Sequence, residues 1–389
     1  MDCVICGSND YKVILNLNCG GFDYSHLYDT VTVVSCNNCG HIFNYLTDEQ
    51  VKGLNDYYLD EYSQCNITSP NKTGDIPGNN SIDSLNRYGE LYKTIINDVK
   101  KESKILDVGC AMGGFLWSLN GLCDNLYGID PSQRFIDIAK NKLINITQGT
   151  AEQIPFQNNT FDIVVADQVV EHLIDPNIFF LEARRVIKDN GILCISVPDA
   201  SKYYKNSFFD FYFFLMREHI QHFGPSQLKQ IAYNNGFTML EYKTTFPNLI
   251  SKSGKLPNLT MKFIKKPTTI YYKMEDQNKS VLDYIDESYK QLIKRRKEIN
   301  NIKINGILGI YGVSREFNYL WNNTPLNKFN VKLFDDTKQK QRMRIDSMEV
   351  LPSDFIKDCN IPKIMITSFA HIETMNDKLK KLNYQGEIL

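Results

Sequence analysis

The amino-acid sequence predicts an α/β protein with a central Rossmann-like sheet, a small cysteine-bearing β module before it and a smaller α/β domain after it. Apolar, strand-like runs alternate with amphipathic helical patterns from about residue 82 to residue 247. A second, shorter alternation of the same kind begins at Ile307, and two Cys-x-x-Cys pairs lie within the first 40 residues. Because alternating strands and helices build parallel sheets, the central and C-terminal blocks should each contain one.

The predicted elements follow in order along the chain. Strand-like runs occupy residues 31–34 and 41–44 of the N-terminal block, and the polar stretch 69–81 that follows is too poor in hydrophobic residues to pack well. The remaining predicted elements are central strands at 104–108, 125–129, 161–166 and 191–197, a charged helix at 280–303, and C-terminal strands at 307–311, 331–334 and 363–367. The central strands should form a parallel sheet.

The chain length implies several compact units, because 389 residues exceed one ordinary domain. The expected segments are a four-cysteine module at 1–65, a polar linker or lid at 66–84, a central domain at 85–250, a connecting helical segment at 251–303 and a C-terminal Rossmann-like domain at 304–389.

Charge and hydropathy narrow the class of partner. The 44 Lys and Arg residues nearly balance the 45 Asp and Glu residues, so the chain lacks the basic excess of a nonspecific nucleic-acid binder or a membrane-surface protein. No apolar run approaches the roughly 20 residues that a membrane span needs, and the first residues do not resemble a secretory leader. We expect a cytoplasmic monomer or homodimer that acts on a small molecule, with no nucleic-acid or membrane partner.

The cysteine pairs predict a structural metal site. Cys3 and Cys6 form one pair, Cys36 and Cys39 the other, and a glycine follows each pair. Two-residue spacing lets a tight turn direct both thiolates at one tetrahedral ion, so four thiolates would fill a closed zinc site without an open coordination position. The alternative is a set of reduced, unpaired thiols.

The glycine-rich turn at residues 107–114 is the strongest functional signal. A hydrophobic strand ends in Asp107, and Gly109 and Gly113 follow before a helical pattern begins. Such a turn brings the backbone close to a ligand, although it could equally hold a dinucleotide. Asp130 ends the next strand about 20 residues later, where a carboxylate can accept the ribose hydroxyls of a nucleoside.

In this order the segments resemble the class I S-adenosylmethionine-dependent methyltransferases, over roughly residues 85–245. The resemblance implies S-adenosylmethionine as cofactor, with its first motif at 107–113, a ribose acid, an adenine-flanking pair and the end of the fourth strand. The implied cofactor-binding residues are Asp107, Gly109, Cys110, Gly113, Asp130, Ala151, Glu152, Asp167 and Gln168. Cys110 can instead simply pack the turn, and Glu171 and His172 can simply support the sheet.

A second cluster suits acceptor chemistry. Glu218, His219 and His222 follow an aromatic-rich segment, where a titratable group in apolar surroundings can act as a general base. Alternatively, the segment only shapes the roof of the active site. Metal ligation by the two histidines is disfavoured, because no further ligand lies nearby in the sequence.

The whole arrangement resembles the zinc-containing nucleotide-sugar methyltransferases, best known for C-methylation of dTDP-linked 4-keto-deoxysugars through an enolate. In that family a Tyr-x-Glu-His segment carries the base; Glu218 and His219 match its end, whereas Met216 replaces its tyrosine. The turn at 309–315 also lacks the lysine of the family's glycine turn, and its Gly-Gly-Ser-x-Arg segment is missing. These departures leave C- and O-methylation both open.

The C-terminal block resembles the Rossmann-like units appended to enzymes of capsule and O-antigen synthesis, as a scaffold or sugar-nucleotide shelf rather than a second redox site. The expected function is methyl transfer from S-adenosylmethionine to a nucleotide-activated sugar, in surface polysaccharide or glycoside biosynthesis. The alternatives are methylation of RNA, protein or another small metabolite, and a non-catalytic scaffold that binds the cofactor.

Overall fold

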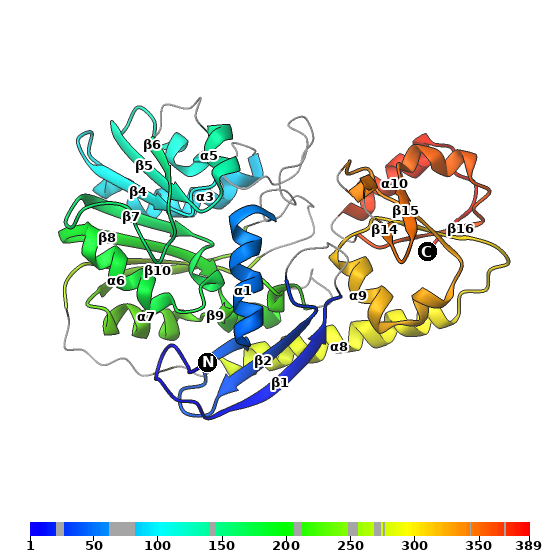
Figure 1. Cartoon of the computed structure of the whole chain (residues 1–389), viewed down its shortest axis with the longest axis horizontal. Coiled ribbons are helices and arrows are strands. Elements are labelled where there is room, and N and C mark those ends of the chain that lie inside the picture. Colours follow the sequence, from blue (N-terminus) through cyan, green and yellow to red (C-terminus); the bar gives the residue numbers. More distant parts are fainter. Residues whose placement is uncertain are drawn as a thin grey trace. The chain divides into compact units, whose positions relative to one another are not determined.

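The computed structural model describes residues 1–20, 27–61, 82–139, 145–205, 212–247, 256–267, 274, 277–338, 340–342, 344–368 and 371–389. The chain forms two compact units (Figure 1). The first contains Met1–Leu15, Thr32–Phe208 and Arg217–Tyr284, and the second contains Asn16–Val31, Phe209–Met216 and Ile285–Leu389. The polar stretch 69–81, predicted as a linker or lid, lies outside the described residues.

A seven-stranded sheet forms the centre of the first unit, in the order β10-β11-β8-β7-β4-β5-β6. Its strands are β4 (Lys104–Val108), β5 (Asn125–Asp130), β6 (Asn145–Gln148), β7 (Phe161–Asp167), β8 (Ile187–Pro198), β10 (Thr238–Thr245) and β11 (Asn258–Ile264). The four predicted central strands are confirmed. The five neighbouring strands β8, β7, β4, β5 and β6 run parallel to one another. The sheet is nevertheless mixed, because β11 runs antiparallel to both β8 and β10.

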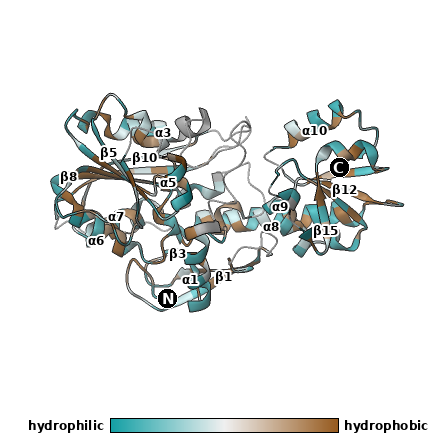
Figure 2. Cartoon of the chain, turned by 45° about the horizontal axis from the view of Figure 1, so that its top comes forward, coloured by the Kyte–Doolittle hydropathy of each residue, from teal (hydrophilic) through white to brown (hydrophobic). Residues whose placement is uncertain are grey.

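Helices cover both faces of this sheet. They are α3 (Ile82–Ile95), α4 (Gly114–Ser118), α5 (Gln133–Ala139), α6 (Pro176–Val186) and α7 (Pro225–Asn234). Successive strand residues point to opposite faces, so Leu106 and Val164 pack with α6 and α7, whereas Ile105 and Val165 pack with α3 and α4. The inner strands β4, β7 and β8 are buried on both faces and are hydrophobic along most of their length (Figure 2), whereas the edge strands β6 and β10 are largely exposed.

The cysteine-bearing segment forms a second sheet, in the order β1-β2-β3-β9. Its strands are β1 (Tyr11–Asn18), β2 (Thr30–Cys36), β3 (Ile42–Tyr45) and β9 (Gln221–His222). Ile42 pairs with His222, so residues that lie between β8 and β10 in the sequence complete the N-terminal sheet. The sequence predicts a four-cysteine module at residues 1–65, and the structure places most of these residues in the same compact unit as the central sheet.

Helix α1 (Asp48–Asp56) follows this sheet. It begins with a capping box in which Thr47 and Gln50 exchange side-chain and backbone hydrogen bonds. The helix continues directly into η1 (Tyr57–Glu61), a π-helical turn. Such turns are rare, and they occur frequently at functional sites.

The second unit contains a six-stranded sheet in the order β14-β15-β13-β12-β16-β17. Its elements are β12 (Leu308–Tyr311), α9 (Arg315–Asn323), β13 (Val331–Phe334), β14 (Arg344–Ile345), β15 (Met348–Leu351), β16 (Lys363–Ile366), α10 (Ile372–Lys381) and β17 (Glu387–Ile388). All pairs except β14 with β15 are parallel, as expected of a Rossmann-like domain. The predicted charged helix is α8 (Asn278–Asn300), within which the boundary between the units falls. Among the described residues, no helix combines the length and apolarity that a membrane span requires.

Candidate active site

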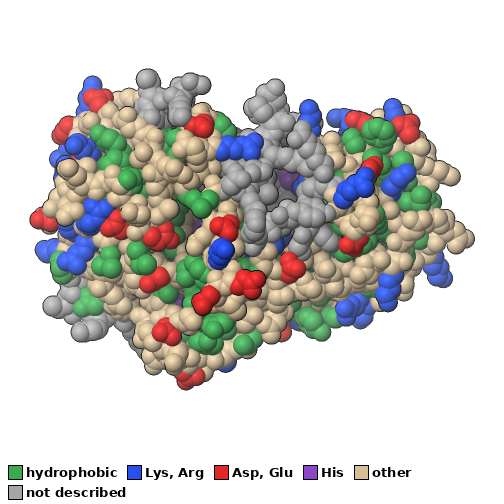
Figure 3. Space-filling model, in the orientation of Figure 1, with side chains coloured by type: hydrophobic (Ala, Val, Ile, Leu, Met, Phe, Trp, Pro, Cys, Tyr) green, Lys and Arg blue, Asp and Glu red, His purple; other side chains and the backbone are tan. Residues whose placement is uncertain are grey.

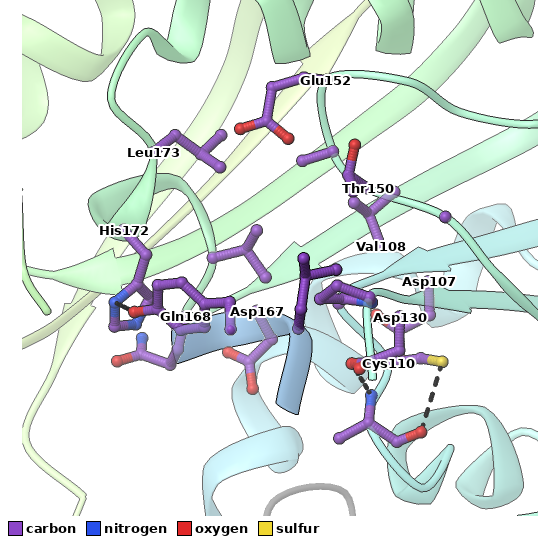
Figure 4. Close-up of a pocket in the computed structure, with 18 of the residues that line it drawn as sticks. Asp107, Val108, Cys110, Asp130, Thr150, Glu152, Asp167, Gln168, His172 and Leu173 are labelled. Atoms are coloured by element: carbon purple, nitrogen blue, oxygen red, sulfur yellow. Dashed lines mark hydrogen bonds between the residues drawn. The ribbon is translucent and has the colours of Figure 1, made fainter. Parts of the chain in front are cut away.

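A cavity of about 420 Å³ lies at the carboxyl ends of β4, β5 and β7 in the first unit. This edge of a parallel sheet is where α/β proteins bind ligands. The predicted cofactor residues that line it are Asp107, Gly109, Cys110, Asp130, Ala151, Glu152, Asp167 and Gln168. In Figure 4, Asp107 and Asp130 lie at one end of the cavity and Gln168 and His172 at the other, with Asp167 between them.

The glycine turn connects β4 to α4. Gly109 has a φ of +72°, and its N–H donates to the Ile129 carbonyl at 2.9 Å. A Cβ at this position would lie 2.5 Å from Val169 Cγ2, so only glycine fits without rearrangement. Gly113, also predicted as a cofactor residue, is the N-cap of α4 with a φ of 71° and is absent from the cavity lining.

Asp130 is fixed by the backbone on both sides. Its Oδ2 accepts from the Ala111 N–H at 2.8 Å, and its Oδ1 accepts from the Ser132 N–H at 2.9 Å. Burial raises the pKa of this carboxyl to about 6, although the two N–H groups act in the opposite direction. Each oxygen retains a second lone pair, so the carboxylate can still accept ligand hydroxyls.

Three carboxyl groups, those of Asp107, Asp130 and Asp167, line the cavity. Burial raises the pKa of Asp107 well above its usual range, and the charges of Asp167 and Asp130 raise it further. Repulsion among these groups would be relieved by a ligand that carries positive charge. The site therefore favours a cationic ligand beside these carboxyl groups.

The Gln168 side chain is held in place by Asn258 of β11. Its Nε2 donates to Asn258 Oδ1 at 3.0 Å, and Ser196 Oγ donates to the same oxygen at 3.1 Å. Gln168 has a φ of 55°, in the left-handed region that non-glycine residues seldom adopt. Such a conformation is characteristic of functional sites.

The other wall of the cavity was not predicted from the sequence. Helix α1 contributes Leu54, η1 contributes Tyr58, and the short turn η3 (Val170–His172) contributes His172. The Glu218 carbonyl lies 2.7 Å from His172 Nδ1 and can only accept, so Nδ1 carries the proton and Nε2 has the lone pair. The Tyr58 hydroxyl lies 2.8 Å from the same Nδ1. Tyr58 has no motif around it that could have identified it.

Glu218, His219 and His222, which the sequence predicts on the acceptor side, lie at different distances from the cavity. Neither Glu218 nor His219 belongs to the described cavity wall, but the His219 ring centroid lies 5.0 Å from that of His172. His222 is fully buried in β9, where Asn44 and Tyr203 lie within 3.4 Å of its ring nitrogens. Burial and the neighbouring His41 lower the pKa of His222 to about 3. The structure therefore does not bring His222 to the cavity.

The four predicted cysteine ligands converge at one place. The Sγ atoms of Cys3 and Cys39 are 3.5 Å apart, those of Cys6 and Cys36 are 3.6 Å apart, and all four sulfurs lie within 4.8 Å of one another. A tetrahedral zinc with bonds of 2.3 Å places its sulfurs about 3.8 Å apart. In each Cys-x-x-Cys turn, the N–H of the glycine that follows the second cysteine donates to the carbonyl of the first cysteine. The cluster fits zinc.

Part of the chain is similar to known methyltransferases. Residues 83–242 match the Methyltransf_23 family, described as a methyltransferase domain. An uncharacterized methyltransferase of Schizosaccharomyces pombe is 35% identical over 142 residues, which cover 31% of this chain and 51% of that protein. A ubiquinone biosynthesis O-methyltransferase of Azorhizobium caulinodans is 32% identical over 102 residues, covering 25% of this chain and 40% of that protein.

A solved S-adenosylmethionine-dependent methyltransferase from Mesorhizobium loti is 13% identical, with a TM-score of 0.39, and the match covers 46% of this chain and 97% of that chain. The chain spans about half, or less, of the length of these two curated relatives.

Proposed function

Because residues 83–242 match a family described as a methyltransferase domain, we propose that the protein transfers a methyl group from S-adenosylmethionine to a nucleotide-activated sugar. One observation carries the choice of acceptor. The carboxylate arrangement that would hold the cofactor's ribose in the first unit recurs in the second unit, where it would hold a second nucleoside.

The cavity of the first unit suits the cofactor. Asp130 would accept the ribose hydroxyls, Ala151 and Glu152 would flank the adenine, and the acidic end around Asp107 would face the positive charge. When bound, S-adenosylmethionine supplies a methyl group on a sulfonium whose thioether is a good leaving group. The protein then needs mainly to exclude water and to hold the acceptor atom in line with the methyl group.

The second unit repeats the carboxylate arrangement. The Gly312 N–H donates to the Phe334 carbonyl at 2.8 Å, as Gly109 donates to the next strand in the first unit. Asp335 directly follows β13, and its Oδ2 accepts from the Val313 N–H at 2.9 Å while its Oδ1 accepts from the Thr337 N–H at 2.8 Å.

The two arrangements support two nucleosides on one chain. A carboxylate beside a glycine turn at the end of the second strand is a common way to hold a ribose. Lys340 Nζ lies 3.2 Å from Asp335 Oδ2, which places a positive charge beside this carboxylate and suits a diphosphate. Asp335 and Lys340 therefore favour a sugar nucleotide over a free sugar.

The acceptor-side residues and the metal complete the proposal. Glu218 and His219, together with His172 at the wall, would hold the acceptor and handle its proton. The four cysteines would hold a zinc ion that stabilises the N-terminal sheet and takes no part in the chemistry. We propose a cytoplasmic role in the synthesis of a surface polysaccharide or glycoside.

The surface charges argue against RNA as the acceptor. On the face drawn in Figure 3, lysines and arginines are interspersed with aspartates and glutamates. The formal net charge of the chain is −1. RNA binding usually needs a positively charged surface that follows the phosphate backbone.

The experiment that tests this function incubates the full chain with methyl-labelled S-adenosylmethionine and a panel of nucleotide-sugars, in 4-keto and reduced forms. Mass spectrometry should find the label on a nucleotide-sugar. Label on carbon next to a ketone would indicate the enolate route, and label on a hydroxyl would indicate O-methylation. Label on a quinone precursor, added to the panel because of the quinone-pathway relative, would contradict the proposed acceptor.

A further inference from the structure

We propose that Glu171, His172 and His219 bind a divalent first-row transition-metal ion at the acceptor side of the cavity. This site is separate from the four-cysteine cluster, and the sequence does not suggest it, because 47 positions separate His172 from His219. The folded chain brings the three side chains together, with one potential ligand atom of each within 4.8 Å of the others. The inference does not depend on the identity of the methyl acceptor.

The distances are close to those that a metal needs. His172 Nε2 lies 3.9 Å from Glu171 Oε1, and the two imidazole rings meet edge to face at 69°. Metal bonds of about 2.1 Å place neighbouring ligand atoms about 3.0 to 3.5 Å apart. Small side-chain rotations would therefore bring the three atoms around one ion.

The orientation of His172 also fits a ligand. Its Nδ1–H donates to the Glu218 carbonyl at 2.7 Å, which leaves the Nε2 lone pair on the side of Glu171. Metal-binding histidines almost always donate their other ring N–H to a carbonyl, carboxylate or water, because this bond fixes the tautomer and the ring direction. Glu218 thus already provides the outer contact that such a site requires.

The backbone holds the two segments of the site together. The Ile220 N–H donates to the Glu171 carbonyl at 2.7 Å. This bond keeps Glu171 and His172 next to His219, the residue that precedes Ile220. Glu171 is 1% exposed and His219 is 7% exposed, so little water competes for their ligand atoms. The site is therefore largely formed before an ion enters.

The donor set indicates the class of metal and its use. Two imidazole nitrogens and one carboxylate oxygen favour ions such as Zn²⁺, Mn²⁺ or Fe²⁺ over Mg²⁺ and Ca²⁺, which prefer oxygen donors. Three protein ligands leave coordination positions open, and His172 lines the cavity. The ion would hold a hydroxyl or ketone oxygen of the acceptor there, and His219 would act on the acceptor through the ion rather than as a free base.

The test measures metal content of the full chain after zinc loading and gel filtration. Wild type should retain two ions per chain, one in each site. Glu171→Gln and His219→Asn should each retain one, and the control His371→Gln, altered in the second unit, should retain two. Cobalt titration of protein whose cysteine site is filled with zinc should give the weak absorption of a nitrogen and oxygen site, without intense thiolate bands.

Two results would overturn the proposal. Wild type could retain a single ion and take up no cobalt once the cysteine site is full, or the two variants could retain as many ions as wild type. S-adenosylmethionine binding and thermal melting of each variant distinguish lost ligation from lost folding. If the chain binds two ions but transfers a methyl group to none of the nucleotide-sugars, the proposed acceptor is contradicted and the proposed metal site is not.

Discussion

At the scale of single residues, the cofactor cavity depends on carboxylates that the backbone holds in place. The sequence predicted Asp130 as the ribose acid, because it ends a strand about 20 residues after the glycine turn. It could not predict the crowding of Asp107, Asp130 and Asp167, because each ends a different strand and only the sheet order makes them neighbours. The ribose role of Asp130 stays a prediction, and two experiments test it.

Replacing Asp130 with Asn should weaken S-adenosylmethionine binding by about 1 to 3 kcal/mol, because one of the two accepting oxygens becomes an NH2 donor that faces other donors in a buried site. Isothermal titration calorimetry measures the change as an increase in Kd of roughly fivefold to 150-fold. The control Asp189→Asn alters an exposed acid and should bind like wild type. An unchanged Kd for the Asp130 variant would remove this residue from the cofactor site.

Cofactor affinity should also depend on pH through Asp130. The pKa of its carboxyl is about 6, so the accepting, ionised form is lost as pH falls below that value. The Kd should rise by up to about tenfold per pH unit below 6 in wild type and stay flatter in Asp130→Asn. Stability of the ligand-free chain should change in the opposite direction, because a raised carboxyl pKa favours the folded state less as pH increases from about 4 to about 6. Parallel pH profiles for the two proteins would contradict this role.

Replacing Gly109 with Ala should destabilise the first unit. The new Cβ would meet Val169 Cγ2 at 2.5 Å in a backbone with a φ of +72°, so we expect a loss of about 1 to 3 kcal/mol. The matched control is Gly121→Ala, because Gly121 has a φ of +84° but nothing within 4 Å of its Cβ position. Urea denaturation should show a larger loss for the Gly109 variant, and equal losses would mean that the clash is relieved.

At the scale of elements, predictability followed continuous burial rather than length. Strands β4, β7 and β8 were predicted because burial on both faces gives continuous hydrophobic runs. Strand β10, longer than β4 and β7, was not predicted because its middle residues are exposed, and β9, with two residues, is too short for any period to show. Strand β9 completes the N-terminal sheet, and η1 contributes to the cavity wall that was not predicted. The acceptor side was therefore the least predictable part of the site.

Removing one of the four proposed zinc ligands should disturb this N-terminal sheet. Cys36 ends β2 and is almost fully buried, so Cys36→Ser should lose the zinc ion of the four-cysteine cluster, retain one ion fewer than wild type, and lower the thermal midpoint by several degrees, since the sheet would lose its main cross-link. Metal analysis and thermal melting measure both effects. Cys359→Ser, at a half-buried thiol in the second unit, should keep its zinc. A Cys36 variant with undiminished zinc would show that the ion is held elsewhere.

At the scale of the whole molecule, two Rossmann-like units each present a carboxylate to a glycine turn. The sequence indicated both alternations of strand and helix, and for the C-terminal block it favoured a scaffold or sugar-nucleotide shelf over a second redox site. The hydrogen bond from the Val313 N–H to Asp335 could not be read from the sequence, because it joins loops that follow different strands. The likeness of the Asp335 hydrogen bonds to those of Asp130 is the basis for assigning a nucleoside to each unit.

The most direct measurement of this central claim is a crossed binding experiment. Asp130→Asn and Asp335→Asn are each titrated with S-adenosylmethionine and with the nucleoside diphosphate of the methylated sugar. We expect the Asp130 variant to lose affinity for S-adenosylmethionine alone and the Asp335 variant to lose affinity for the nucleoside diphosphate alone. If Asp335→Asn binds the nucleoside diphosphate as tightly as wild type, the second unit does not hold the acceptor's nucleoside and the proposed acceptor class is wrong.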